Sequence, residues 1–165
     1  MNKQKKIRTV NHKIFRFFMN LYPPLLANRV RIKYVSKDFK ELKLVVKKSI
    51  FNRNLAGTIF GGTIFSAADP FHAVMYWQIF AHQYNMNVRV WLKAADISYK
   101  RPSESNLYYH FIISDEDVAK AKKALDERGR YFVTHTINAT NKQDEICAVI
   151  NLTTYIGLKV LDKRK

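Results

Sequence analysis

One long apolar segment, residues 59–81, limits the possible folds more than any other feature of the sequence. Its apolar residues at 60, 64, 67, 71, 74 and 75 have the three- and four-residue spacing of a helix, and Ala68, Ile79 and Phe80 widen the stripe. A helix that is apolar on almost every side has to be buried. A flat sheet covers only one side of a helix, so this segment predicts a curved sheet wrapped around a long central helix.

The rest of the chain supplies strands for such a sheet. Alternating apolar and polar residues, broken by turn residues, mark each strand. A short exposed helix over 115–128 interrupts the strands, with Ser114 and Asp117 as a capping box and Gly129 as its stop. This element order predicts an α+β domain. The expected strands are a pair within 30–48 around a Ser-Lys-Asp turn, a long strand over 88–101 ended by Pro102, a strand over 107–114, and a hairpin of 131–140 and 145–156 around the turn 141–144.

Positive charge is concentrated in the N-terminal third. The whole chain carries a net charge of +16, of which residues 1–50 contribute +12. Within this region, residues 11–22, extended back to Ile7 and Val10, show a helical pattern that Pro23-Pro24 ends. The helix either docks on its own domain or lies on a membrane as a basic amphipathic helix. We therefore expect a basic amphipathic helix and connector (1–28), one main domain (29–160) and a basic tail (161–165).

The composition also bears on partners and location. A basic surface suits a coenzyme with several phosphates, an anionic membrane face or an acidic carrier protein contacted through residues 1–22. Nucleic acid is disfavoured as a partner, because the chain has no zinc-finger spacing, no RNP-like aromatic motif and no helix-turn-helix pattern. The single cysteine, Cys147, excludes an intramolecular disulfide. No run of 18 apolar residues exists, so we expect a soluble, cytoplasmic protein.

Three of the five glycines cluster at the start of the central helix, at Gly57, Gly61 and Gly62. Without a Cβ atom, glycine lets another molecule approach the backbone. The free N–H groups of a helix N-terminus can then stabilise an acyl oxygen that develops negative charge, as in an oxyanion hole. Close packing of the helix on the sheet would also call for glycine at these positions.

An acid in this apolar segment, Asp69, is followed directly by Pro70. Asp is a good N-cap and Pro is favoured at a first helical position, so the pair can simply start a helix. In a continuous helix Pro70 would instead cause a kink, and the carboxylate could face a cavity. His72, three residues further on, is either a proton-transfer partner on the same face or a packed interface histidine. The other histidines show no metal-ligand spacing, so we assign no metal.

Residues 52–69, "NRNLAGTIFGGTIFSAAD", resemble the signature of the hot-dog thioesterases, in particular the phenylacetate-pathway type. The matching residues, in order and spacing, are Asn54, Gly57, Gly61, Gly62 and Asp69. The likeness extends over roughly residues 40–157 and is nearest to a hot-dog subgroup of unknown function that carries "NRN…GTIFGG…ADP". The resemblance implies the hot-dog fold, with its long central helix wrapped by a curved antiparallel sheet. The N-terminal helix is an addition to it.

The resemblance further implies an acyl-CoA thioesterase without a cofactor, built as a homodimer or a dimer of dimers with its active sites at the subunit interface. Asp69 would activate water or attack the thioester. Gly61, beside Gly62, would polarise the carbonyl through its backbone N–H, and Asn54 would position the attacking group. Gly57 and His72 would lie at the substrate.

Two further residue assignments concern substrate binding. Lys100 and Arg101, at a strand end beside Pro102, are candidates for the coenzyme phosphates, an inference from their charge rather than from a motif. Phe60 stands where the family has His, which removes a polar donor beside the thioester and makes the pocket more apolar. An apolar pocket would raise the pKa of Asp69 by desolvation. The alternative to a hydrolase is therefore a non-catalytic hot-dog module that binds an acyl chain, CoA or an acyl-carrier protein.

Overall fold

The structure is a computed structural model that describes residue 7 and residues 9–159. The expected basic tail, 161–165, and the first six residues of the basic N-terminal segment lie outside the described residues. The elements in chain order are α1 (His12–Leu21), α2 (Pro23–Ala27), β1 (Val30–Val35), β2 (Glu41–Val46), α3 (Gly61–Ser66), α4 (Phe71–Tyr84), β3 (Val88–Tyr99), β4 (Leu107–Ile112), α5 (Asp115–Arg128), β5 (Arg130–Thr140) and β6 (Ile146–Leu158).

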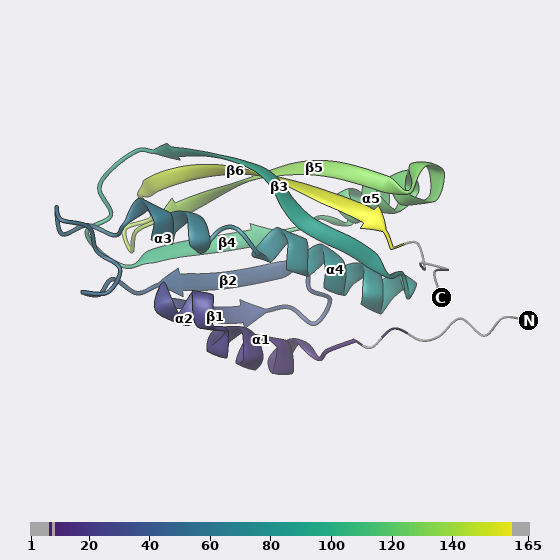
Figure 1. The fold of residues 1–165 in the computed structure, drawn as a ribbon, viewed down its shortest axis with the longest axis horizontal. Coiled ribbons are helices and arrows are strands. Elements are labelled where there is room, and N and C mark those ends of the chain that lie inside the picture. The colour runs from purple at the N-terminus through teal and green to yellow at the C-terminus, as the bar shows by residue number, and fades with distance from the viewer. Residues whose placement is uncertain (1–6, 8, 160–165) are drawn as a thin grey trace, which may run out of the picture.

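The described strands form one six-stranded sheet in the order β1-β2-β4-β5-β6-β3, and every pairing is antiparallel. The sheet curves around α4, which lies against one of its faces (Figure 1). The predicted α+β architecture, a curved antiparallel sheet around a central helix with an extra N-terminal helix, is confirmed. The side chains of α4 that fill the core are completely buried: Phe71, Met75, Tyr76, Ile79 and Phe80.

The central apolar segment forms two helices, α3 and α4, which is one of the two alternatives that the Asp69-Pro70 pair left open. The break falls around Pro70, whose ring nitrogen cannot donate to the preceding turn. The Asp69 carboxylate does not cap α4, because Pro70 occupies the N-cap position and no side chain bonds there. Phe60 also departs from the predicted buried stripe, since it precedes α3 and is 57% exposed.

Helix α1 covers the outer edge of β1, where unpaired backbone groups would otherwise face solvent (Figure 1). The Asn20 side chain accepts from the Ile32 N–H at 2.7 Å and donates to the Ile32 carbonyl at 3.1 Å. The helix begins at His12 rather than at Ile7, because the Asn11 side chain accepts from the Lys13 N–H and caps it.

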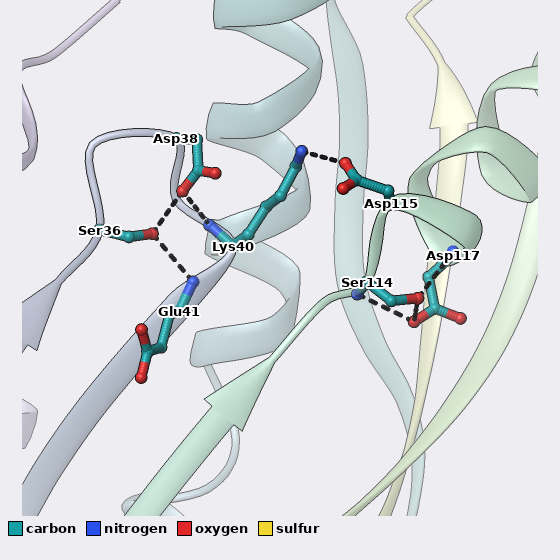
Figure 2. Close-up of polar contacts among 7 residues, drawn as sticks. All are labelled: Ser36, Asp38, Lys40, Glu41, Ser114, Asp115 and Asp117. Atoms are coloured by element: carbon teal, nitrogen blue, oxygen red, sulfur yellow. Dashed lines mark hydrogen bonds and ion pairs between the residues drawn. The ribbon is translucent and has the colours of Figure 1, made fainter.

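The turn between β1 and β2 is held to the start of α5. Lys40 forms an ion pair with Asp115, and its backbone N–H donates to Asp38 (Figure 2). The predicted capping box is confirmed, with the Ser114 hydroxyl and the Asp117 carboxylate each accepting from the other's backbone N–H. These contacts fix the end of the domain that lies away from the glycine-rich segment.

Candidate functional site

The glycine-rich segment forms one wall of a pocket of about 510 Å³, a size suited to a small-molecule ligand. The other wall is the end of β3 and the four residues after it. A backbone hydrogen bond from the Ile59 N–H to the Ser103 carbonyl, 2.9 Å long, joins the two walls. The lining residues are Asn54, Ala56, Thr58, Ile59, Gly61, Ile64, Tyr99, Lys100, Arg101, Pro102 and Ser103.

Asn54 lies in this wall, but its side chain is already engaged in shaping the loop. Its amide nitrogen donates to the Thr58 hydroxyl at 2.9 Å, and its amide oxygen accepts from the Thr58 N–H at 3.1 Å. Gly57 completes the same turn with a φ of +77°, a conformation that L side chains rarely adopt. Gly57 does not line the pocket. Both residues thus give the wall its shape.

The two glycines at the start of α3 accommodate aromatic rings of the same chain. A Cβ atom on Gly61 would lie 2.9 Å from the Tyr99 hydroxyl oxygen, and this hydroxyl donates to the Gly61 carbonyl. A Cβ atom on Gly62 would lie 2.4 Å from the Phe60 ring. The Gly61 and Gly62 N–H groups enter no backbone hydrogen bond among the described residues. Gly61 lines the pocket, whereas Gly62 and Phe60 do not.

The cationic side of the pocket has one engaged and one free side chain. Arg101 forms an ion pair with Glu145, whose pKa is lowered by hydrogen bonds from Asn141 and Arg101. Lys100 is exposed and takes part in no ion pair within the described part of the chain. Both backbone N–H groups donate to the Cys147 carbonyl, which anchors this strand end to β6. Lys100 is therefore the cation that is free to meet an anionic ligand.

Asp69 does not line this pocket in its own chain. It lies half-buried between α3 and α4, and its carboxylate forms no hydrogen bond or ion pair with the residues that the structure describes. Burial raises the pKa of Asp69 above its usual value of 3.8. No oxygen of Asp69 is among the buried, unbonded polar atoms of the described residues, so the half-buried carboxylate keeps access to solvent. It can therefore accept a hydrogen bond or a proton from a molecule outside the chain.

His72 lies in the core and not at the pocket. It is 1% exposed, its ring stacks on His135 with centroids 4.3 Å apart, and its Nδ1 atom has no hydrogen-bond partner. Burial, together with the nearby His135, lowers the pKa of His72 to about 3. His135 in turn bonds the Tyr76 hydroxyl at 3.0 Å. No hydrogen bond joins His72 to Asp69 among the described residues, and the ring of His72 contacts His135 and Phe111 instead.

Two pocket residues were not anticipated from the sequence. Tyr99 closes over Gly61, and Ser103 places a buried hydroxyl without a hydrogen-bond partner in the pocket wall. Tyr99 looked like an ordinary strand residue, and only its position two residues before Arg101 hinted at the site. Ser103 gave no signal. No group of three or more His, Cys, Asp or Glu residues in the described ranges is arranged to hold a metal ion.

The family is decided by a match over residues 11–156 to the model described as "Domain of unknown function (DUF4442)". The chain belongs to the DUF4442 family. This match covers both the glycine-rich segment and the pocket, and it agrees with the predicted hot-dog subgroup of unknown function. The comparison with curated protein sequences finds no match.

Solved structures place this DUF4442 chain in the hot-dog fold. A Pseudomonas aeruginosa protein of unknown function, described as a probable thioesterase, superposes with a TM-score of 0.78 at 14% identity, covering 92% of this chain and 98% of its own. A Chlorobaculum tepidum protein of unknown function gives 0.74 at 14% identity, with 92% and 99% covered. A Haemophilus influenzae thioesterase gives 0.69 at 11% identity, with 95% and 97% covered. The predicted hot-dog fold is confirmed.

Proposed function

We propose that this protein hydrolyses acyl thioesters, with acyl-CoA as the substrate. The observation that carries the proposal is the pocket in which Gly61, with its unbonded N–H, faces the cationic strand end at Lys100. The Gly61 N–H would donate to the thioester carbonyl oxygen as it becomes negative. Lys100 would bind a phosphate group of the coenzyme. Hot-dog neighbours that are named as thioesterases support the same reaction class.

We propose that a second copy of the chain completes the site. Strand β3 is twelve residues long and lies at an edge of the sheet. A long exposed edge strand has unpaired backbone groups that can pair with another strand. Helix α1 covers the β1 edge of the sheet and not the β3 edge. The exposed aromatic residues of β3, Trp91 (48%) and Tyr99 (56%), would be buried by pairing with β3 of a second copy. Such a homodimer, alone or in a dimer of dimers, would bring Asp69 of one copy to the pocket of the other.

Asp69 would then act as the base that activates water, or as the nucleophile. Either role needs the ionised carboxylate, which exists above its pKa. Because desolvation raises the pKa of Asp69, the rate should fall on the acid side at a pH above 3.8 rather than at the usual value. Phe60 takes no part in the pocket, so polarisation of the carbonyl would depend on the backbone N–H alone.

The test is a panel of acyl-CoA and acyl-carrier thioesters assayed with the wild type, Asp69→Asn and the matched control Asp126→Asn. Asp126 is an exposed acid of α5 that pairs with Lys122, and such surface pairs contribute little. We expect Asp69→Asn to lower kcat at least about a hundredfold, with the control unchanged. Equal turnover by Asp69→Asn and wild type would remove Asp69 from the chemistry.

A non-catalytic binding module is the second candidate. The observation in its favour is that both polar atoms of the Asn54 amide are hydrogen-bonded to Thr58. Fewer polar groups are then available to position an attacking water. If the protein is a binding module, the wild type hydrolyses none of the thioesters but binds acyl-CoA, and Lys100→Glu weakens that binding. Calorimetric titration with a non-hydrolysable acyl-CoA distinguishes this outcome from hydrolysis.

A further inference from the structure

The apolar stripe of α1 faces solvent instead of the core. Four residues at positions i, i+3, i+4 and i+7 form one stripe along the helix. Their exposed fractions are 52% for Ile14, 60% for Phe17, 63% for Phe18 and 49% for Leu21. A neighbouring face, through Phe15, packs on the domain. The helix is thus held in place by a narrow face while its widest apolar surface has no partner among the described residues.

Two more large apolar side chains are exposed in the segment directly after this stripe. Tyr22, at the junction, is 49% exposed, and Leu26 of α2 is 37% exposed. We call the six residues together the α1–α2 face: Ile14, Phe17, Phe18, Leu21, Tyr22 and Leu26. Single exposed apolar residues are ordinary on a protein surface, but a contiguous patch of large side chains marks a binding surface.

The sequence that contains this face is strongly cationic. Among residues 7 and 9–50, which the structure describes, ten are Lys or Arg and only two are acids. Both acids are bonded to residues that do not belong to the face. Asp38 accepts from Ser36 and from the Lys40 N–H, and Glu41 is bonded to Lys43 and His110 (Figure 2 shows the contacts of Asp38). Lys13, one turn before Phe17, borders the stripe itself.

This combination discriminates between possible occupants of the face. A second copy would bring another N-terminal region of net charge +12 against the first, and like charges repel. An anionic lipid surface satisfies both features at once, because large apolar side chains enter the acyl boundary while Lys and Arg meet the headgroups. We propose that the α1–α2 face docks this protein onto anionic membranes, with the helix lying in the plane of the interface.

The fold presents the helix suitably for this role. Asn20 and Arg16 bond the Ile32 and Lys33 backbone on the side of α1 toward β1. These contacts preorganise the helix before it meets a membrane, so binding does not have to fold it first. Docking also leaves the pocket free, since its lining contains no residue of α1 or α2. The proposal does not depend on the proposed hydrolase activity.

The test is flotation of the full chain with vesicles of phosphatidylcholine alone and of an equal mixture with phosphatidylglycerol. We expect binding to the anionic mixture that weakens as salt is added, since salt screens the charges. Phe17→Ser and Phe18→Ser should each weaken it about tenfold, because each removes a large apolar contact. Lys13→Glu should weaken binding to the anionic mixture at low salt.

The matched control is Phe132→Ser, which removes a similarly exposed aromatic residue (42%) from β5, away from the face. It should bind as the wild type does. Circular dichroism confirms that each variant is folded. Absent binding to anionic vesicles, or equal binding by the wild type and both Phe variants, would overturn the proposal. So would light scattering that shows a larger wild-type oligomer which Phe17→Ser dissociates, because the face would then bind a second copy.

Discussion

The buried pair of His72 and His135 predicts that this protein loses stability in mild acid. His72 is buried with its Nδ1 atom unbonded, and its pKa is lowered to about 3 from 6.5. Below pH 6.5 the unfolded chain therefore binds a proton at His72, whereas in the folded protein His72 stays neutral until the pH approaches 3. The free energy of unfolding is therefore not reduced by His72 above pH 6.5, and it decreases as the pH falls from 6.5 toward 3.

The magnitude follows from the size of this shift. Each pH unit below 6.5 costs about 1.4 kcal/mol for one such histidine, so His72 alone should cost about 2 kcal/mol at pH 5. Burial also lowers the pKa of His135, against the opposing effect of Asp117, and its contribution has the same sign. Between pH 6.5 and 5 the carboxylates whose pKa is lowered, such as Asp117 and Glu145, stay largely ionised in both states. The raised pKa of Asp69 acts in the opposite direction.

Urea unfolding followed by tryptophan fluorescence at constant ionic strength measures this slope between pH 7.5 and 5. His72→Gln should be less stable than the wild type at pH 7.5. Below pH 6.5, however, its free energy of unfolding should depend on pH less steeply than that of the wild type, by about 1.4 kcal/mol per pH unit. The control, Gln78→Leu, replaces a buried polar residue of the same helix that does not titrate, and it should keep the wild-type slope. A wild type whose stability is flat from pH 7.5 to 5, or a His72→Gln variant with an unchanged slope, would refute the reasoning.

Three substitutions probe the backbone supports of the fold and the pocket. Asn20→Leu should cost about 2 kcal/mol in urea unfolding through its two lost bonds to Ile32, and light scattering should show more self-association as the β1 edge opens. Gly57→Ala should cost about 1–2 kcal/mol through φ strain alone, since its Cβ would touch nothing, and a normal Tm would contradict this. Gly61→Ala should displace Tyr99 and weaken acyl-CoA binding measured by calorimetry. Unchanged binding would show that the position of Tyr99 does not matter for the ligand.

The sequence was most informative where apolar periodicity is decisive. The strands, the capping box at Ser114 and the buried centre of α4 all follow from local pattern, because burial imposes that pattern on every residue of an element. The break at Pro70 was foreseen as one of two alternatives. That Asp69 caps neither helix was not foreseeable, since it depends on where α4 begins.

The site was harder to predict because its residues depend on contacts between distant segments. The sequence did select the loop of Asn54 and the strand end at Lys100, which the fold brings together. It could not show that His72 lies beside His135, because that contact joins α4 to β5 across the core. Nor could it show that the apolar stripe of α1 faces outward, since periodicity gives the width of a stripe and not its direction.

The central claim, that Asp69 of one copy serves the pocket of another, is tested most directly by mixing two impaired variants. Asp69→Asn lacks the carboxylate, and Lys100→Glu disables the pocket. If the site is shared, each mixed dimer contains one site with both groups intact. Equal amounts that exchange subunits freely should then recover about one quarter of the wild-type kcat/KM, because half of the dimers are mixed and each has one good site. A mixture no more active than the average of its two components would contradict the shared site.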